Sequence, residues 1–168
     1  MTARRNNFSA RGFTLMELVL VMLVMAIVAA FAAPNLRNFI SGRHATDAAS
    51  EILALATWAR SQAISEGRMY QLNVDPSAGT VSVSAEDDTG AIQPVESTLV
   101  DPVVLPTGTG AVRMDTDLPA GDNGIPAAKF YPTGRVDPGS IHLTDDHNNV
   151  ITITSDSASE NYHIVEGK

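Results

Sequence analysis

An apolar run near the N-terminus constrains this chain most. Residues 18–33 contain no charged side chain, and Glu17 is the only charge between Phe13 and Ala33. As a helix that rises about 1.5 Å per residue, residues 13–33 would cover roughly 31 Å, close to the thickness of the hydrocarbon core of a bilayer. The run therefore predicts a single membrane-spanning helix.

The distribution of charge predicts how this helix is oriented. Residues 1–12 carry three arginines and no acid, and no further base follows until Arg37. Because positive residues mark the cytoplasmic side, we expect the N-terminus in the cytoplasm and the chain after Pro34 outside the inner membrane, in the periplasm. Residues 67–168 hold fifteen acids and five bases, a net charge of −10, within a whole chain of −8. This acidity disfavours a protein that works mainly on nucleic acid.

A conventional secretory signal peptide is the alternative interpretation of the run. A basic start, an apolar stretch and small residues at Ala30 and Ala32 all fit such a signal. Glu17 disfavours it, because a charge in the bilayer costs about 2.5–3.5 kcal/mol on insertion scales and a discarded peptide gains nothing from it. Pro34 would also hinder cleavage just before it. This alternative would leave a secreted β-rich binding or enzymatic domain.

The residues around Glu17 resemble a known processing signal. Residues 11–17, R-G-F-T-L-M-E, are similar to the signal of type IV pilins and type II secretion pseudopilins. The resemblance implies that a prepilin peptidase cuts between Gly12 and Phe13 and that Phe13 is then N-methylated. Glu17 matches the family's acidic residue at the fifth mature position, and Pro34 matches its proline at the twenty-second.

Charge pairing gives this arrangement a physical reason. Cleavage would remove the +3 leader, residues 1–12, and expose an α-amino group at Phe13. In a bundle of such helices, the Glu17 carboxylate is expected to pair with the Phe13 amine of a neighbour, which offsets part of its desolvation cost and fixes the axial register. Apolar residues 15–33 would then pack in a filament core instead of lipid.

The next segment, residues 34–66, favours an amphipathic helix. Alanine is frequent, Gly67 is placed to stop the helix, and Pro34 is expected to kink or loosen it. Trp58 is interpreted as a packing or interface residue. One apolar stripe recurs at spacings of three and four residues and is expected to face the core: Ala45, Ala48, Ile52, Leu55, Ala59 and Ala63.

From residue 67 onward the composition changes to β-branched residues broken by glycine and proline. This predicts an antiparallel β-rich head packed on the stripe, an α+β fold, with a hairpin turn at residues 75–79. The expected strands are residues 68–74, 80–84, 99–105, 111–114, 129–131, 140–144, 149–154 and 162–165.

Two further stretches resemble the GspH/FimT group of minor pilins and pseudopilins. Residues 59–64, A-R-S-Q-A-I, are similar to the A-R-S-E-A-I motif of that group, with Gln62 in place of Glu. Residues 130–135, F-Y-P-T-G-R, are similar to its F-x-P-x-G motif. The resemblance implies the pilin fold and a single-pass inner-membrane subunit that enters a thin filament, at its tip or in the initiating complex. The implied partners are other pilin or pseudopilin subunits, the prepilin peptidase and the inner-membrane assembly platform. The residues after the membrane segment slightly favour a type IV pilus over a type II secretion pseudopilus.

Possible ligand sites in the head are few. Asp115, Asp117 and Asp122 offer oxygen ligands to calcium, but their spacing is not that of an EF-hand, so an acidic surface loop is the preferred interpretation. The stretch 145–149 is interpreted as a turn. The chain has no cysteine, no nucleophile motif and no phosphate-binding glycine motif, so we expect no enzymatic activity and no cofactor.

DNA uptake is a further alternative, because some FimT-type subunits take up DNA through a basic C-terminal motif. Here residues 159–168 contain two acids and one base. Only a local patch of Arg113, Lys129 and Arg135 could attract phosphate in so acidic a head. We therefore expect nucleic acid not to be a partner.

Overall fold

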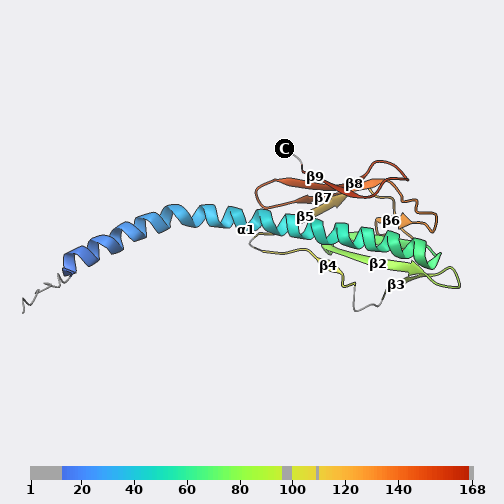
Figure 1. Ribbon diagram of the computed structural model, residues 1–168, viewed down its shortest axis with the longest axis horizontal. Coiled ribbons are helices and arrows are strands. Elements are labelled where there is room, and N and C mark those ends of the chain that lie inside the picture. The colour runs from blue at the N-terminus through green and yellow to red at the C-terminus, as the bar shows by residue number, and fades with distance from the viewer. Residues whose placement is uncertain (1–12, 96–99, 109, 167–168) are drawn as a thin grey trace, which may run out of the picture. The chain divides into compact units, whose positions relative to one another are not determined.

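The structure is a computed structural model that describes residues 13–95, 100–108 and 110–166; the side chains of residues 31–42 and 166 lie outside that description. The chain divides into two compact units, residues 1–37 and 38–168, and each is described by itself. Helix α1 (Leu15–Glu66) contributes to both units, and all the strands belong to the second, the head (Figure 1).

Helix α1 ends where the sequence predicts. Gly67 follows it with φ of 68° and donates its N–H to the Ala63 carbonyl at 3.1 Å, so a glycine in the left-handed region closes the last turn. Helical backbone continues through Pro34. The kink expected at Pro34 stays a prediction, because this residue is among those whose side chains are not described.

The apolar part of α1 is described from its start to Ala30. Within the described residues, the structure contains no helix that is both long enough and apolar enough to cross a membrane. The expected span, residues 13–33, runs past Ala30 into side chains outside the description, so it also stays a prediction.

The first sheet of the head is antiparallel, with the strand order β3-β2-β1-β6 and β4 also paired with β2. The turn at residues 75–79 joins β1 to β2 as predicted, and Leu72 and Val83 face each other in their register. The strands are β1 (Tyr70–Asp75), β2 (Thr80–Glu86), β3 (Ile92–Pro94), β4 (Val103–Val104) and β6 (Ala127–Phe130).

The second sheet is also antiparallel, with the order β5-β7-β8-β9. Ile141 and Ile153 are paired across β7 and β8, and both are fully buried. The turn predicted at residues 145–149 joins these two strands. The strands are β5 (Arg113–Thr116), β7 (Gly139–Thr144), β8 (Val150–Ser155) and β9 (His163–Glu166).

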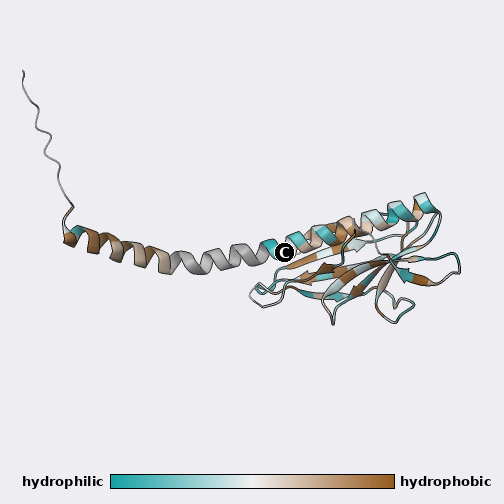
Figure 2. Ribbon diagram, turned by 90° about the horizontal axis from the view of Figure 1, so that it is seen from below, coloured by the Kyte–Doolittle hydropathy of each residue, from teal (hydrophilic) through white to brown (hydrophobic). Residues whose placement is uncertain are grey.

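One apolar core joins the head's part of α1 to both sheets (Figures 1 and 2). Every residue of the predicted stripe is buried, with exposed fractions between 0% and 9%. Alanine dominates this face of the helix, and larger side chains from the sheets, such as Leu72 and Phe130, belong to the same core. The expected α+β architecture is confirmed.

The strand predictions differ from the structure mainly at their ends. The expected strand at residues 99–105 begins at a residue outside the description, and of residues 100–105 only β4 (Val103–Val104) pairs with β2, so the prediction is wrong in length there. Pro102 and Pro106 flank it, and proline has no N–H for a ladder. Strand β3 was not predicted, because three residues ending in a proline show no alternation.

Candidate functional site

The described N-terminal segment begins with a capped helix. The Glu17 N–H is shared between Thr14 Oγ1, at 3.2 Å, and the Thr14 carbonyl, at 3.1 Å, so Thr14 caps the helix start. Phe13 precedes the helix and is 82% exposed. Glu17 is the acidic residue of the first turn, where the helix dipole favours a negative charge. Gly12, the other residue of the predicted cleavage site, lies outside the described residues.

The first unit presents an uncovered apolar surface. Every large apolar side chain from Phe13 to Val28 is between 51% and 83% exposed, and Figure 2 shows this part of α1 as mostly hydrophobic. A surface of this kind needs lipid or another protein to cover it. Glu17 is the one charged side chain within it.

Arg60 attaches helix α1 to the C-terminal half of the head. Its Nε donates to the Gly134 carbonyl at 2.9 Å, and its Nη2 donates to the Ser159 carbonyl at 3.3 Å. Gly134 has φ of 81°, and a Cβ there would lie 3.5 Å from Ile64 Cδ1. The two motifs that resemble the GspH/FimT group, residues 59–64 and 130–135, are therefore in contact.

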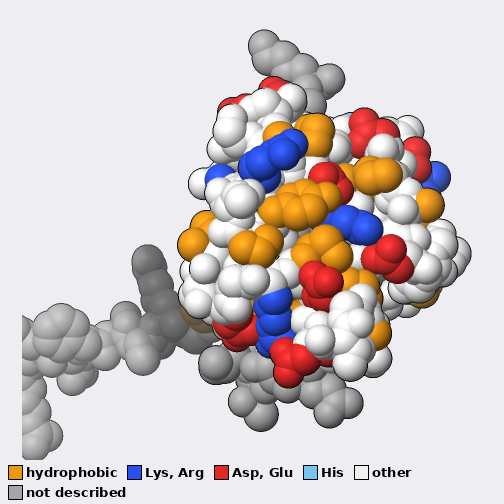
Figure 3. Space-filling model, turned by 90° about the vertical axis from the view of Figure 1, so that its right-hand side faces the viewer, with side chains coloured by type: hydrophobic (Ala, Val, Ile, Leu, Met, Phe, Trp, Pro, Cys, Tyr) orange, Lys and Arg blue, Asp and Glu red, His pale blue; other side chains and the backbone are white. Residues whose placement is uncertain are grey.

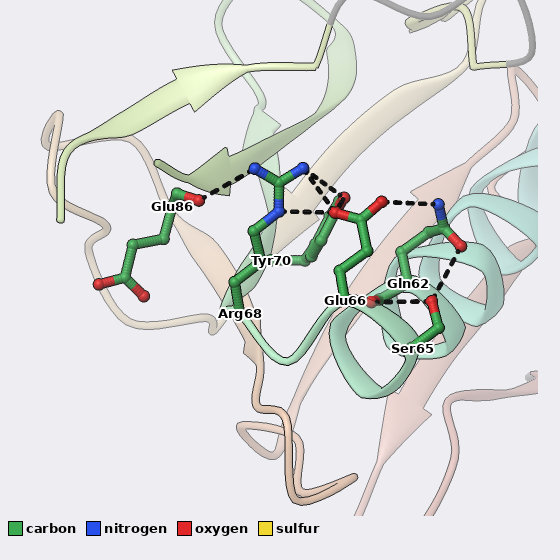
Figure 4. A network of polar contacts seen from close by, with 6 residues as sticks. All are labelled: Gln62, Ser65, Glu66, Arg68, Tyr70 and Glu86. Carbon is green, nitrogen blue, oxygen red and sulfur yellow. Dashed lines mark hydrogen bonds and ion pairs between the residues drawn. The ribbon is translucent and has the colours of Figure 1, made fainter. Parts of the chain in front are cut away.

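A polar network connects the C-terminal end of α1 to β1 and β2 (Figure 4). The Tyr70 hydroxyl donates to Glu66 Oε2 at 2.8 Å, and Arg68 forms an ion pair with the same carboxylate while donating to the Glu86 carbonyl at 3.4 Å. The hydrogen bond from Tyr70, followed by that from Arg68, lowers the pKa of Glu66 below its ordinary value. Trp58 packs edge-on against Tyr70 with ring centroids 5.8 Å apart, which confirms its packing role.

The three calcium candidates do not converge. Asp117 accepts bonds from the backbone N–H and the hydroxyl of Ser140, at 2.6 and 2.9 Å, and the backbone bond lowers its pKa. Asp122 lies 3.3 Å from Lys129 Nζ, and Asp115 accepts the N–H of Thr116. Each aspartate therefore has its own structural partner. Asp117 and Asp122 lie in loops, as the surface-loop interpretation expects, whereas Asp115 lies on β5.

One acidic group with metal-like spacing occurs in the described part of the chain. The ligand atoms of Asp145, Asp146 and His147 lie within 4.8 Å of one another. Asp145 already accepts the N–H groups of His147 and Asn149 and the Asn149 side-chain amide, at 2.8–2.9 Å. Burial alone would raise the pKa of Asp145, but the bonds from Asn149 and His147 outweigh burial and lower it. This carboxylate stabilises the turn between β7 and β8.

The basic residues suggested for DNA binding are distributed over the head. Arg113 pairs in register with Thr144 at one end of β7, and Arg135 precedes the other end of that strand. Arg135 lies in the turn after β6, where its carbonyl accepts the Tyr131 N–H at 2.9 Å. Lys129 is paired with Asp122, and the face shown in Figure 3 mixes both signs of charge among hydrophobic side chains.

The sequence did not predict a groove on the outward face of α1. It has a volume of about 590 Å³, and Leu53 and Trp58 are its large apolar residues. The spacing of three and four residues was present, but serine and threonine interrupt the apolar pattern. The lining residues are Ser50, Leu53, Ala54, Thr57, Trp58 and Ser61.

Comparison with known proteins connects these features to a family. A family model described as type II transport protein GspH matches residues 48–162, and a model of the prokaryotic N-terminal methylation motif matches residues 7–33. Two fimbrial proteins of Pseudomonas aeruginosa are each 39% identical over 66 residues, which is 39% of this chain. The chain spans 42% of the length of these curated relatives.

Solved structures share the fold. The minor pseudopilin EpsH from the type 2 secretion system of Vibrio cholerae has a TM-score of 0.61 at 13% identity, over 73% of this chain and 97% of EpsH. The type IV minor pilin FimU of Pseudomonas aeruginosa has a TM-score of 0.51 at 15% identity, over 77% and 92% of the two chains. The GspH model covers well over half of the chain and includes the stripe from Ala48 onward, strands β1 to β8 and the contact between Arg60 and Gly134. The chain therefore belongs to the GspH family of type II transport proteins.

Proposed function

We propose that this chain is a minor pilin or pseudopilin, a structural subunit that residues 13–33 anchor in the inner membrane until it is packed into a filament. The observation that carries the proposal is the uncovered apolar surface of α1 with Glu17 as its one charge. Lipid covers such a surface in the membrane, and the same segment of neighbouring subunits covers it in a filament. The subunit acts at filament initiation or at the tip, through assembly and without a catalytic step.

The proposal includes processing of the N-terminus. A prepilin peptidase cuts between Gly12 and Phe13, and Phe13 is then N-methylated. The match of the methylation motif to residues 7–33 and the exposed position of Phe13 ahead of the helix support this step. The inner-membrane assembly platform then extracts the subunit, and the Glu17 carboxylate pairs with the Phe13 amine of a neighbour.

Intact mass of the mature protein tests the processing step. The chain is expressed with a prepilin peptidase, purified from the membrane and weighed by mass spectrometry. The expected mass is that of residues 13–168 plus one methyl group. A mature chain that starts near Ala33 or Pro34 would instead indicate a conventional signal peptide and a secreted head.

The assembly step is tested with Glu17→Ala. We expect normal membrane insertion but reduced incorporation into sheared filaments. Without the Glu17 carboxylate, the Phe13 amine of the neighbouring subunit would have no partner in an apolar core. Glu51→Ala is the matched control, since Glu51 is an exposed glutamate on the same helix. Equal incorporation of the Glu17→Ala variant and the wild type would contradict the pairing.

A further inference from the structure

Strand β1 is buried on both of its faces, although polar and apolar side chains alternate along it. Leu72 belongs to the apolar core, so Gln71 and Asn73, which flank it, point to the opposite face of the sheet. They are nevertheless only 1% and 6% exposed. A buried polar group is costly unless its hydrogen bonds are made, so the donors and acceptors of this face need partners inside the protein.

The cover over this face is the loop that leads into β6. Gly121 donates its N–H to the Ile125 carbonyl at 2.7 Å, which folds the loop back on itself. A β-carbon on Gly121 would lie 2.9 Å from Ala127 Cβ and 3.5 Å from Gln71 Nε2. The missing side chain of this glycine therefore allows the loop to approach the Gln71 amide closely and to separate it from solvent.

A short chain of hydrogen bonds runs through the buried amides. Gln71 Nε2 donates to Asn73 Oδ1 at 2.6 Å, and Asn73 Nδ2 donates to Ser84 Oγ at 2.8 Å. This chain uses the nitrogen of the Gln71 amide and leaves its oxygen, Oε1, enclosed with no donor among the described residues. Such an acceptor bears the full cost of its lost hydration.

The side chain that faces Gln71 does not supply the missing donor. Lys129 lies opposite Gln71 in the register of β1 and β6, on the same face of the sheet. Its ammonium group is paired instead with Asp122, at 3.3 Å from Oδ2. The partner of Gln71 Oε1 must therefore be small, because the loop already touches the amide, and it must be able to donate a hydrogen bond.

We propose that Gln71 binds a water molecule enclosed between β1 and the loop at residues 119–126. The water donates one hydrogen to Gln71 Oε1 and the other to the Ile125 carbonyl. That carbonyl oxygen lies 3.0 Å from the position of a β-carbon on Gly121, on the side where the Gln71 amide also lies. It accepts the Gly121 N–H with one lone pair and has a second available. A buried water with such partners is a permanent part of a fold.

Magnetic relaxation dispersion of the water oxygen tests this site in the full-length chain in detergent micelles, because it counts waters that stay bound far longer than surface water. Gln71→Met keeps the length of the side chain and removes both polar atoms, and we expect the variant to lose about one long-lived water. Gln93→Met is the matched control, since it makes the same change at an exposed glutamine of the same sheet and should keep the wild-type count. An equal count for Gln71→Met and the wild type would overturn the proposal.

A crystal structure of the wild-type chain supplies a test that does not depend on how the variant folds. We expect an ordered water within hydrogen-bond distance of both the Gln71 side-chain amide and a carbonyl of the loop. Two other arrangements would overturn the proposal, because the protein would then satisfy Gln71 by itself. In one, Lys129 Nζ donates directly to the Gln71 oxygen. In the other, the amide is turned over and its NH2 group donates directly to the loop.

Discussion

Arg60 and Gly134 lie 74 positions apart in the chain, and the Nε of Arg60 donates to the Gly134 carbonyl at 2.9 Å. The bond joins the C-terminal half of α1 to the turn after β6. A second bond, to the Ser159 carbonyl, extends the contact to the turn after β8. One guanidinium group therefore connects the helix to two turns that follow strands of different sheets.

Replacing Arg60 should loosen this connection. Arg60→Met keeps the apolar stem and removes both hydrogen bonds, and we expect a loss of about 1–3 kcal/mol in the free energy of unfolding. Arg60→Lys should recover only part of it, because an ammonium group lacks the planar fork that meets two carbonyls. Urea unfolding of the purified chain in detergent measures the loss. Arg135→Met, at an exposed arginine in the same turn, is the control and should change stability by less than about 0.5 kcal/mol.

A side chain at Gly134 should lower the stability of the fold. Gly134→Ala places a β-carbon at φ of 81° and 3.5 Å from Ile64 Cδ1. We expect a loss of about 1–2 kcal/mol, almost all of it from the left-handed backbone, since 3.5 Å is ordinary contact. Gly124→Ala is the matched control, because its φ is 78° and nothing lies within 4 Å of its β-carbon. Thermal unfolding should give similar losses for both variants, and a much larger loss at Gly134 would show that the contact with Ile64 is tighter than the structure has it.

Sequence periodicity predicted the helix side of this contact well. Alanine at spacings of three and four residues identified the buried face of α1, because burial of one helix face follows directly from that period. It did not identify the partners of Arg60. Both partners are backbone carbonyls, which any residue supplies, so no residue type marks them in a sequence. The resemblance of residues 59–64 and 130–135 to family motifs identified both stretches but did not predict their contact.

For the calcium candidates, the sequence suggested a group of residues that the structure places apart. Asp115, Asp117 and Asp122 are close in sequence, which suggested a shared site. In the structure Asp115 lies on β5 and Asp117 just beyond it, bonded to Ser140 at the start of β7, while Asp122 lies in the next loop, beside Lys129 of β6. Closeness in the sequence did not bring these carboxylates to one site, because β5 ends at Thr116 and the chain then turns, so that Asp117 bonds to Ser140 and Asp122 to Lys129.

Tyr162 should contribute to stability through its hydroxyl. It is 6% exposed, packs against Phe130 with ring centroids 6.1 Å apart, and donates to the Asp137 carbonyl at 2.8 Å. Burial, followed by the nearby Asp137 and Asp117 carboxylates, raises the pKa of Tyr162, so the hydroxyl stays protonated and able to donate. Tyr162→Phe leaves the buried carbonyl without this donor, and we expect a loss of about 1–2 kcal/mol by urea unfolding. Tyr131→Phe, at a half-buried tyrosine, is the comparison and should cost less.

The bond between Asp117 and Ser140 should make stability depend on pH in the acid range. The Ser140 N–H lowers the pKa of Asp117 below its ordinary value of 3.8, so the folded state binds this proton less readily than the unfolded state. The resulting stabilisation is fully present above pH 3.8 and is lost as the pH falls through the lower, folded pKa. Asp117→Asn removes the charge, so the variant should be less stable than the wild type at neutral pH, and the difference should shrink as the pH falls below 3.8. Asp101→Asn, at an exposed aspartate, is the control and should keep the wild-type pH profile. Urea unfolding at a series of pH values measures both, and a difference between Asp117→Asn and the wild type that stays constant down to about pH 2 would contradict the role of the Asp117 charge.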